Sequence, residues 1–151
     1  MAGRPADLDG DIFDAGPGGG VSTVLICEDD RSVARLLALT FGLEGHEVEV
    51  VADGVAGGQR LDGEPVDLAV LDVMLPGHDG LAVLRELRTR PGWENTRVIV
   101  LTALDGDAAV WRGWASGADY YLTKPFDLEH LREVAARLLA GEPLEAEQAA
   151  G

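Results

Sequence analysis

Four short apolar runs, each followed at once by an acid, a hydroxyl or an ammonium group, constrain this chain more than any other feature. In chain order the runs are Val24–Cys27, Leu68–Leu71, Val98–Leu101 and Tyr120–Thr123. The residues that follow them are Glu28, Asp29 and Asp30, then Asp72, then Thr102, and finally Lys124. Open parallel sheets bind ligands just beyond the carboxyl ends of their strands, where groups from different strands converge. The pattern therefore predicts a parallel sheet and also the edge at which its chemistry is gathered.

Apolar residues at helical spacing separate the predicted strands. The clearest case is Arg31–Leu43, whose predicted core-facing stripe is Val33, Leu36, Leu37, Thr40 and Phe41. Further helices are predicted over 53–61 and 107–116. Two more are predicted to begin at an aspartate N-cap. The one after Asp79 has a stripe of Leu81, Leu84 and Leu87, and the one after Asp127 has Leu128, Leu131, Ala135 and Leu138 on one face. Every predicted strand is thus followed by a helix.

The strands differ in how their apolar residues are arranged. Val21–Cys27, Val66–Leu71 and Arg97–Leu101 are nearly continuous apolar runs, which is typical of strands covered on both faces. His46–Val51 alternates glutamate with valine, and Tyr120–Leu122 is short, so both are predicted at sheet edges. Five strands in strict alternation with five helices predict an α/β fold, a flavodoxin-like doubly wound (βα)5 arrangement. Its parallel five-stranded sheet would have the order 2-1-3-4-5.

Composition divides the chain into three parts. Residues 1–20 are rich in Gly and Asp and are predicted to be a disordered acidic tail. Residues 21–140 hold every predicted element and form one domain, and the 46% hydrophobic content of the whole chain suffices for a core without disulfides. Residues 141–151 are predicted to be a flexible C-terminal tail.

Charge and cysteine content limit the function classes. A formal net charge of −15 argues against direct contact with nucleic acid or anionic lipid, since both attract Lys and Arg. The single cysteine, Cys27, cannot form an internal disulfide, and neither a signal-peptide pattern nor a membrane-spanning stretch is found. We therefore expect a cytoplasmic protein without membrane or nucleic-acid contacts.

The predicted strand order places three carboxylates together. The first and third strands are neighbours in that order, so Glu28, Asp29 and Asp72 should meet at one edge of the pocket. Packed carboxylates repel one another, and a hard divalent cation such as Mg²⁺ neutralises them through oxygen ligands. Asp72 can then act as a nucleophile toward a phosphoryl group, while Lys124 supplies positive charge and Thr102 a hydroxyl donor. The predicted chemistry is phosphoryl transfer.

Four stretches of the chain resemble one known family. Residues 24–30, 67–80, 98–103 and 117–126 look like the receiver domain of bacterial two-component response regulators, the CheY-like family, with similarity over about residues 22–140. Asp29 lies 43 residues before Asp72, and Thr102 and Lys124 lie 30 and 52 residues after it, which fits the family. The resemblance implies that Asp72 is the phospho-acceptor.

The resemblance also implies a metal site. Glu28 and Asp29 correspond to the acidic pocket of the family. Mg²⁺ would be held there together with Asp72 and the main-chain carbonyl of Met74. Lys124 matches the lysine that contacts the phosphate, and its bond to Pro125 is expected to be cis, at low cost for an X–Pro link.

The resemblance further implies a conformational output. Thr102 and Tyr121 correspond to a switch pair, in which phosphorylation draws the hydroxyl inward and the aromatic ring moves from exposed to buried. The phosphoryl donor would be a sensor histidine kinase or a phosphotransfer protein. The receiver would catalyse only its own phosphorylation and dephosphorylation. We expect a stand-alone receiver that presents an altered face to a downstream target protein.

Oligomeric state is predicted from a departure from the family pattern. Val134 and Ala136 stand where many DNA-binding relatives carry basic residues for dimer salt bridges. We therefore expect the chain to be a monomer.

Two alternatives and one local ambiguity stay open from the sequence. A Mg²⁺-dependent aspartyl-nucleophile phosphatase also uses Asp, Thr and Lys. It needs a second acid two residues after the nucleophile, where this chain has Met74. A degenerate receiver would only bind partners, against which the acidic trio and Lys124 argue. Asp30 either assists the acidic pair or caps the first helix.

Overall fold

The computed structural model describes residues 21–72, 80–102 and 117–142. Residues 1–20 and 143–151 of the two predicted tails, the Asp79 cap, Met74 and the helix expected over 107–116 lie outside these residues. None of the helices in the described part of the chain combines the length and apolar character that a membrane span requires.

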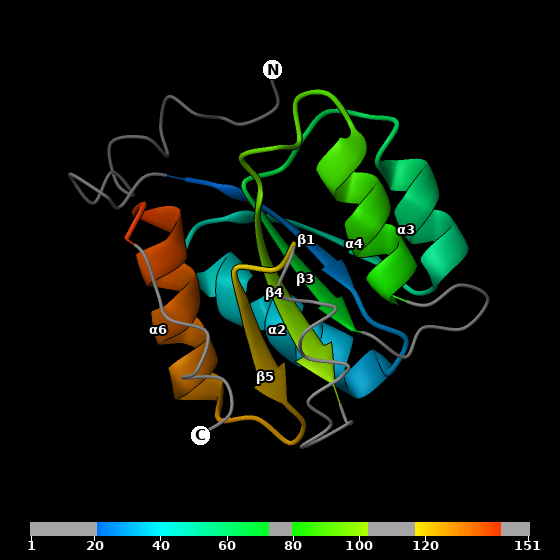
Figure 1. Ribbon diagram of the computed structural model, residues 1–151. Coiled ribbons are helices and arrows are strands. Elements are labelled where there is room, and N and C mark those ends of the chain that lie inside the picture. Colours follow the sequence, from blue (N-terminus) through cyan, green and yellow to red (C-terminus); the bar gives the residue numbers. More distant parts are fainter. Residues whose placement is uncertain (1–20, 73–79, 103–116, 143–151) are drawn as a thin grey trace.

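A single five-stranded parallel sheet forms the centre of the molecule (Figure 1). Its strands are β1 (Thr23–Cys27), β2 (Glu47–Val51), β3 (Leu68–Asp72), β4 (Arg97–Thr102) and β5 (Tyr120–Thr123). They lie in the order β2-β1-β3-β4-β5, and every neighbouring pair is parallel. The predicted doubly wound fold and its strand order are therefore confirmed.

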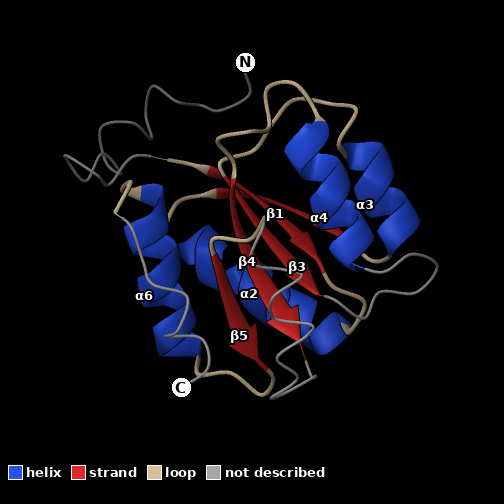
Figure 2. Ribbon diagram, in the orientation of Figure 1, coloured by secondary structure: helices blue, strands red, loops and turns tan. Residues whose placement is uncertain are grey.

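Four helices cover the sheet in the described residues, two on each face (Figure 2). They are α2 (Arg31–Leu43), α3 (Gly54–Arg60), α4 (Gly80–Thr89) and α6 (Leu128–Leu139). Successive side chains of a strand point to opposite faces. On β1, Val24 and Ile26 therefore pack into the core beneath α2 and α6, whereas Leu25 and Cys27 pack into the core beneath α3 and α4. The continuous apolar run of β1 is needed because both faces are covered.

Aspartates begin three of these helices. The side chain of Asp30 accepts hydrogen bonds from the backbone N–H groups of Ser32 and Val33, at 2.9 and 3.2 Å. Asp53 and Asp127 accept in the same way at the starts of α3 and α6. The capping role of Asp127 was predicted, and of the two roles open for Asp30 the structure places it as the N-cap of α2.

The predicted core-facing stripe of α2 is wrong at one position. The buried residues of this helix are Ala34, Leu37 and Phe41. Leu36 is 43% exposed. The face of the helix that packs on the sheet is centred on the three buried residues, and Leu36 lies outside that face. Apolar residues cover more of the helix circumference than the sheet can bury, so spacing alone does not identify which of them face inward.

Strand ends also differ slightly from the predicted ones. β1 begins at Thr23 rather than at Val21, which is 43% exposed. β3 begins at Leu68 rather than Val66 and includes Asp72. Boundaries shift because apolar residues flank the strands without entering the hydrogen-bonded ladder.

Arg88 joins α4 to the start of β5. Its guanidinium donates to the carbonyl oxygens of Gly117 and Thr96 at 2.8 and 2.7 Å, and to the Asp119 carboxylate at 3.1 Å. The same carboxylate oxygen, Asp119 Oδ2, also accepts the backbone N–H of Val98 at 2.8 Å. One side chain thereby satisfies acceptors from two separate segments.

We predict that Arg88→Met lowers the free energy of unfolding by about 2 kcal/mol, because partly buried acceptors lose their donor. Arg85→Met on the same helix is the matched control. Arg85 is exposed and has no ion pair or hydrogen bond within the described residues, so its replacement should change stability by less than about 0.5 kcal/mol. Urea unfolding measures both values, and equal effects would contradict the prediction.

The single cysteine lies at the end of β1 and is fully buried. Burial, with a smaller contribution from the negative charge of Glu49, raises the pKa of the Cys27 thiol to about 12. The thiolate is the reactive form, so the native protein should present almost none of it near neutral pH.

We predict that Cys27 reacts with Ellman's reagent at least about 100-fold more slowly in the native protein than in urea. The reaction can be followed by absorbance, with the urea-unfolded chain as the reference. Prompt stoichiometric reaction of the native protein would show that the thiol is not shielded.

Candidate functional site

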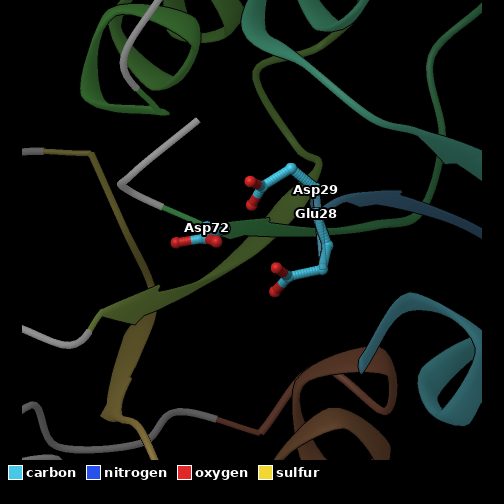
Figure 3. Close-up of side chains that lie close together, drawn as sticks. All are labelled: Glu28, Asp29 and Asp72. Atoms are coloured by element: carbon cyan, nitrogen blue, oxygen red, sulfur yellow. The ribbon is translucent and has the colours of Figure 1, made fainter. Parts of the chain in front are cut away.

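Strand register brings the predicted acids to one edge of the sheet. Cys27 of β1 pairs with Leu71 of β3. Glu28 directly follows Cys27, and Asp72 directly follows Leu71. Glu28 and Asp29 therefore meet Asp72 at the carboxyl ends of neighbouring strands. Figure 3 shows the three carboxylates turned toward a common space, and one oxygen from each lies within 4.8 Å of the others.

The three acids differ in their access to solvent. Glu28 and Asp72 are 1% and 3% exposed, whereas Asp29 is exposed. Two carboxylates thus lie in the protein interior and one at the rim. A buried carboxylate is costly unless a cation or hydrogen-bond donors compensate it.

Lys124 supplies the compensating charge from the end of β5. Its ammonium nitrogen lies 3.1 Å from Asp72 Oδ2, to which it donates a hydrogen bond, and 2.9 Å from Glu28 Oε1. The second contact is an ion pair without hydrogen-bond geometry, so Glu28 Oε1 is a buried acceptor with no hydrogen-bond donor in the described structure. The other oxygen of Glu28 accepts the backbone N–H of Asp30 at 3.0 Å. One ammonium faces three carboxylates, which leaves an excess of negative charge.

The excess charge is reflected in the pKa values. Burial raises the pKa of Glu28 above its usual range, and the nearby Asp72 carboxylate adds to this, although Lys124 and the Asp30 N–H act in the opposite direction. Burial alone would lower the pKa of Lys124, but its contacts with Glu28 and Asp72 outweigh this and raise it. Lys124 is therefore firmly positive, and the pocket favours an additional cation.

Thr102 lies at the end of β4, between β3 and β5. It is fully buried, and its backbone carbonyl accepts the N–H of Lys124 at 2.6 Å. The Lys124–Pro125 peptide bond is cis, as the resemblance implied. Thr102 is thus joined directly to the residue that carries the ammonium.

Tyr121, the other member of the predicted switch pair, lies in β5. Its ring is partly buried and packs against both hydrophobic cores of the sheet. A side chain in contact with both cores can be affected by changes on either face. Met74, the remaining predicted ligand, lies outside the described residues.

One polar pair between β5 and α6 was not predicted from the sequence. The hydroxyl of Tyr120 lies 3.1 Å from Nε2 of His130 on α6, and the two rings meet edge to face with centroids 5.9 Å apart. Tyr120 is only 1% exposed. His130 precedes the buried Leu131 on α6, so its position next to the inward face was the available signal.

Comparison with known proteins identifies the family of the chain. A family model described as Response regulator receiver domain matches residues 24–136. The chain belongs to this family. As a receiver domain it acts in two-component signalling, in which receivers accept phosphate from histidine kinases.

Curated relatives include the transcriptional regulatory protein TcrA of Mycobacterium tuberculosis. It is 45% identical over 108 residues, which cover 72% of this chain and 42% of TcrA. The response regulator MprA of Mycobacterium ulcerans is 39% identical over 127 residues, or 84% of this chain and 54% of MprA. The chain spans about half the length of these relatives.

Solved receiver structures have the same fold. The receiver domain of Francisella response regulator 1452 matches with a TM-score of 0.70 and 33% identity, over 80% of this chain and 97% of that one. The BeF3-activated receiver domain of DrrB matches with a TM-score of 0.69 and 31% identity, over 80% and 98%.

The crowded carboxylates generate a prediction about stability. In EDTA, Asp72→Asn should raise the free energy of unfolding by about 1 kcal/mol, since an amide can still accept from Lys124 but no longer repels Glu28. The exposed Asp29→Asn is the matched control and should have a smaller effect. Urea unfolding measures both. A destabilised Asp72→Asn would mean that attraction by Lys124 outweighs the repulsion.

Proposed function

We propose that the chain accepts a phosphoryl group on Asp72 from a sensor histidine kinase or a phosphotransfer protein, with Mg²⁺ bound beside it. The observation that carries this proposal is the contact of Asp72 with Lys124, 3.1 Å long, inside a cluster of three carboxylates. A nucleophile, a fixed positive charge and a cation site are the parts that phosphoryl transfer requires.

The proposed reaction uses Asp72 as nucleophile. One carboxylate oxygen attacks the phosphorus of a phosphorylated imidazole, an O–P bond forms, and the P–N bond breaks. The imidazole leaves with the electron pair of that bond and recovers a proton from solvent. Lys124, whose pKa is raised, remains positive throughout and pairs with a phosphoryl oxygen. The Thr102 hydroxyl would donate a hydrogen bond to another oxygen.

The residues fit a Mg²⁺ ion. Glu28, Asp29 and Asp72 offer hard oxygen ligands, and Asp29 at the exposed rim leaves room for the waters that Mg²⁺ retains. Glu28 Oε1, buried without a hydrogen-bond donor, indicates that the pocket accommodates more positive charge than Lys124 supplies. The main-chain carbonyl of Met74 is proposed as a further ligand. When bound, the ion would offset the negative charge of the nucleophile and of the incoming phosphoryl oxygens.

The output would pass through the proposed switch pair. Lys124 is hydrogen-bonded to the Thr102 carbonyl, and Tyr121 packs against both cores from the neighbouring strand. A phosphoryl group that attracts the Thr102 hydroxyl can therefore change the packing of Tyr121, and with it the face presented to a target protein.

The state and the partners of the whole protein are further proposals. That the receiver acts alone, as a monomer and without nucleic-acid contact, stays a prediction from the sequence. The relative TcrA, of which this chain matches 42%, is by contrast named as a transcriptional regulatory protein. Lys124 contacts two members of the acidic trio, Glu28 and Asp72. These contacts support a receiver that accepts phosphate over a module that only binds partners.

We predict that acetyl phosphate with Mg²⁺ adds one phosphoryl group to the protein, as measured by intact mass spectrometry. Asp72→Asn should abolish the adduct, EDTA should prevent it, and Lys124→Met should slow its formation about 100-fold. Asp67→Asn is the matched control, because Asp67 precedes the same strand at its opposite end and contacts Thr23. Persistence of the adduct in Asp72→Asn, or its absence in the wild type, would refute the proposal.

A further inference from the structure

The outer face of α2 carries three large apolar side chains that are exposed. Leu36, Leu39 and Leu43 are 43%, 58% and 80% exposed. Their spacing of three and four residues places them in one row, which we call the apolar stripe. Isolated exposed leucines are ordinary, but a continuous row along a helix marks a contact surface.

Two arginines extend this face toward the amino end of the helix. Arg31 and Arg35 are exposed, and neither forms an ion pair or hydrogen bond with any described residue. They lie one turn apart, so they form a basic patch without a counter-charge among the described residues, which we call the arginine pair. The outer face of α2 is therefore basic at its amino end and apolar at its carboxyl end.

The N-terminal segment leaves the folded domain beside the apolar end of α2. The N–H of Ser22 donates to His46 Nδ1 at 3.1 Å, and the Ser22 carbonyl accepts the N–H of Glu47 at 2.9 Å. Leu43, the most exposed residue of the apolar stripe, lies only three residues before His46. The start of β1 and the end of α2 lie at the same side of the molecule (Figure 1).

The sequence of that segment is complementary to the α2 face in apolar character and in charge. Reading back from Val21, it has a Gly-rich stretch over 16–20, then Asp14, then Phe13 and Ile12, and then further acidic residues interrupted by Leu8. The aspartates are Asp7, Asp9, Asp11 and Asp14. From the exit point, three of the four aspartates lie beyond Phe13 and Ile12, as the two arginines of α2 lie beyond its three exposed leucines.

The length of the connection is sufficient. The seven residues between Phe13 and Val21 can extend over about 23 Å. The 13 residues of α2 cover about 20 Å. Phe13 and Ile12 can therefore reach any part of the apolar stripe.

We propose that residues 7–14 dock along the outer face of α2 in the same molecule. Their apolar side chains would cover the apolar stripe, and their aspartates would lie beside the arginine pair. Segments with few apolar residues do not fold alone, but they can become ordered on a complementary surface. Attachment at Val21 gives it an effective concentration in the millimolar range, so weak contacts suffice.

Docking has a consequence for the site that rests on the proposed function. Arg31 follows the acids of the pocket rim by only two residues, so aspartates beside it would add negative charge where a phosphodonor approaches. Phosphorylation should then be slower in the docked chain. The docking itself does not depend on this.

Paramagnetic NMR on the full-length chain tests the docking. In Gly10→Cys a nitroxide can be attached selectively, because Cys27 is buried and its pKa is raised to about 12. The label should remove most of the amide signal of the outer face of α2. Amides of α4, on the opposite face of the sheet, should keep theirs. The reduced label supplies the reference intensities.

Matched variants identify the contacts. Ile12→Ser with Phe13→Ser, or Arg31→Glu with Arg35→Glu, should restore the α2 signals at least severalfold. Arg85→Glu on α4, which also replaces an exposed arginine, should not. Equal loss on α2 and α4, or loss confined to α6, would overturn the proposal. So would broadening of ¹⁵N-labelled wild type by added nitroxide-labelled, unenriched protein, since that contact is between two copies.

A second readout separates the docking from the proposed function. The Ile12→Ser, Phe13→Ser chain should accept phosphate from acetyl phosphate about threefold faster than the wild type if docking adds charge at the rim. Selective broadening of α2 without any phosphorylation of Asp72 would support the docking and refute the proposed function. Phosphorylation without selective broadening would do the reverse.

Discussion

The contact of one ammonium with two buried carboxylates is the interaction on which the remainder of the site depends. Lys124 comes from the end of β5, Glu28 from the end of β1 and Asp72 from the end of β3. Three strands that are distant in sequence must therefore keep their parallel register for the charges to meet. A shift of one residue in any of these strands would turn its side chains to the opposite face and leave a charge buried without a partner. The electrostatics of the pocket thus depend on the same register that forms the sheet.

This arrangement favours function over stability. One lysine does not neutralise three acids, so the pKa of Glu28 is raised and the folded chain holds a concentration of negative charge. The protein tolerates this because the strands that carry the acids are buried between two hydrophobic cores, one on each face of the sheet. Strained or repulsive groups at a working site are commonly supported by the stability of the surrounding structure.

The sequence predicted the fold and the meeting of the site residues because both follow from short-range patterns. Continuous apolar runs identified the central strands, alternation identified the edge strand β2, and the polar residue after each run identified the carboxyl edge. Prediction failed for α2, which has apolar residues both on the face that packs on the sheet and on the face exposed to solvent. Leu36 has the spacing of a core residue, but the direction of α2 is set by its packing on the sheet.

Long-range polar contacts were beyond reach for a different reason. The pairing of Tyr120 with His130 and of Arg88 with Asp119 depends on which helix lies against which strand end, and no local pattern encodes the distance between side chains. The roles of Thr102, Tyr121 and Met74 were implied by the family resemblance and not by any local pattern of the chain.

The Arg88–Asp119 contact also bears on how β5 can move. Asp119 precedes β5 and is held both by Arg88 and by the backbone of β4, whereas Lys124 lies just past the opposite end of this four-residue strand. A strand secured at its first residues pivots more readily than it slides. When the charge in the pocket changes, the backbone of β5 should therefore move most at Lys124 and least at Asp119. The strand would rotate about its first residues, which Arg88 of α4 holds in place.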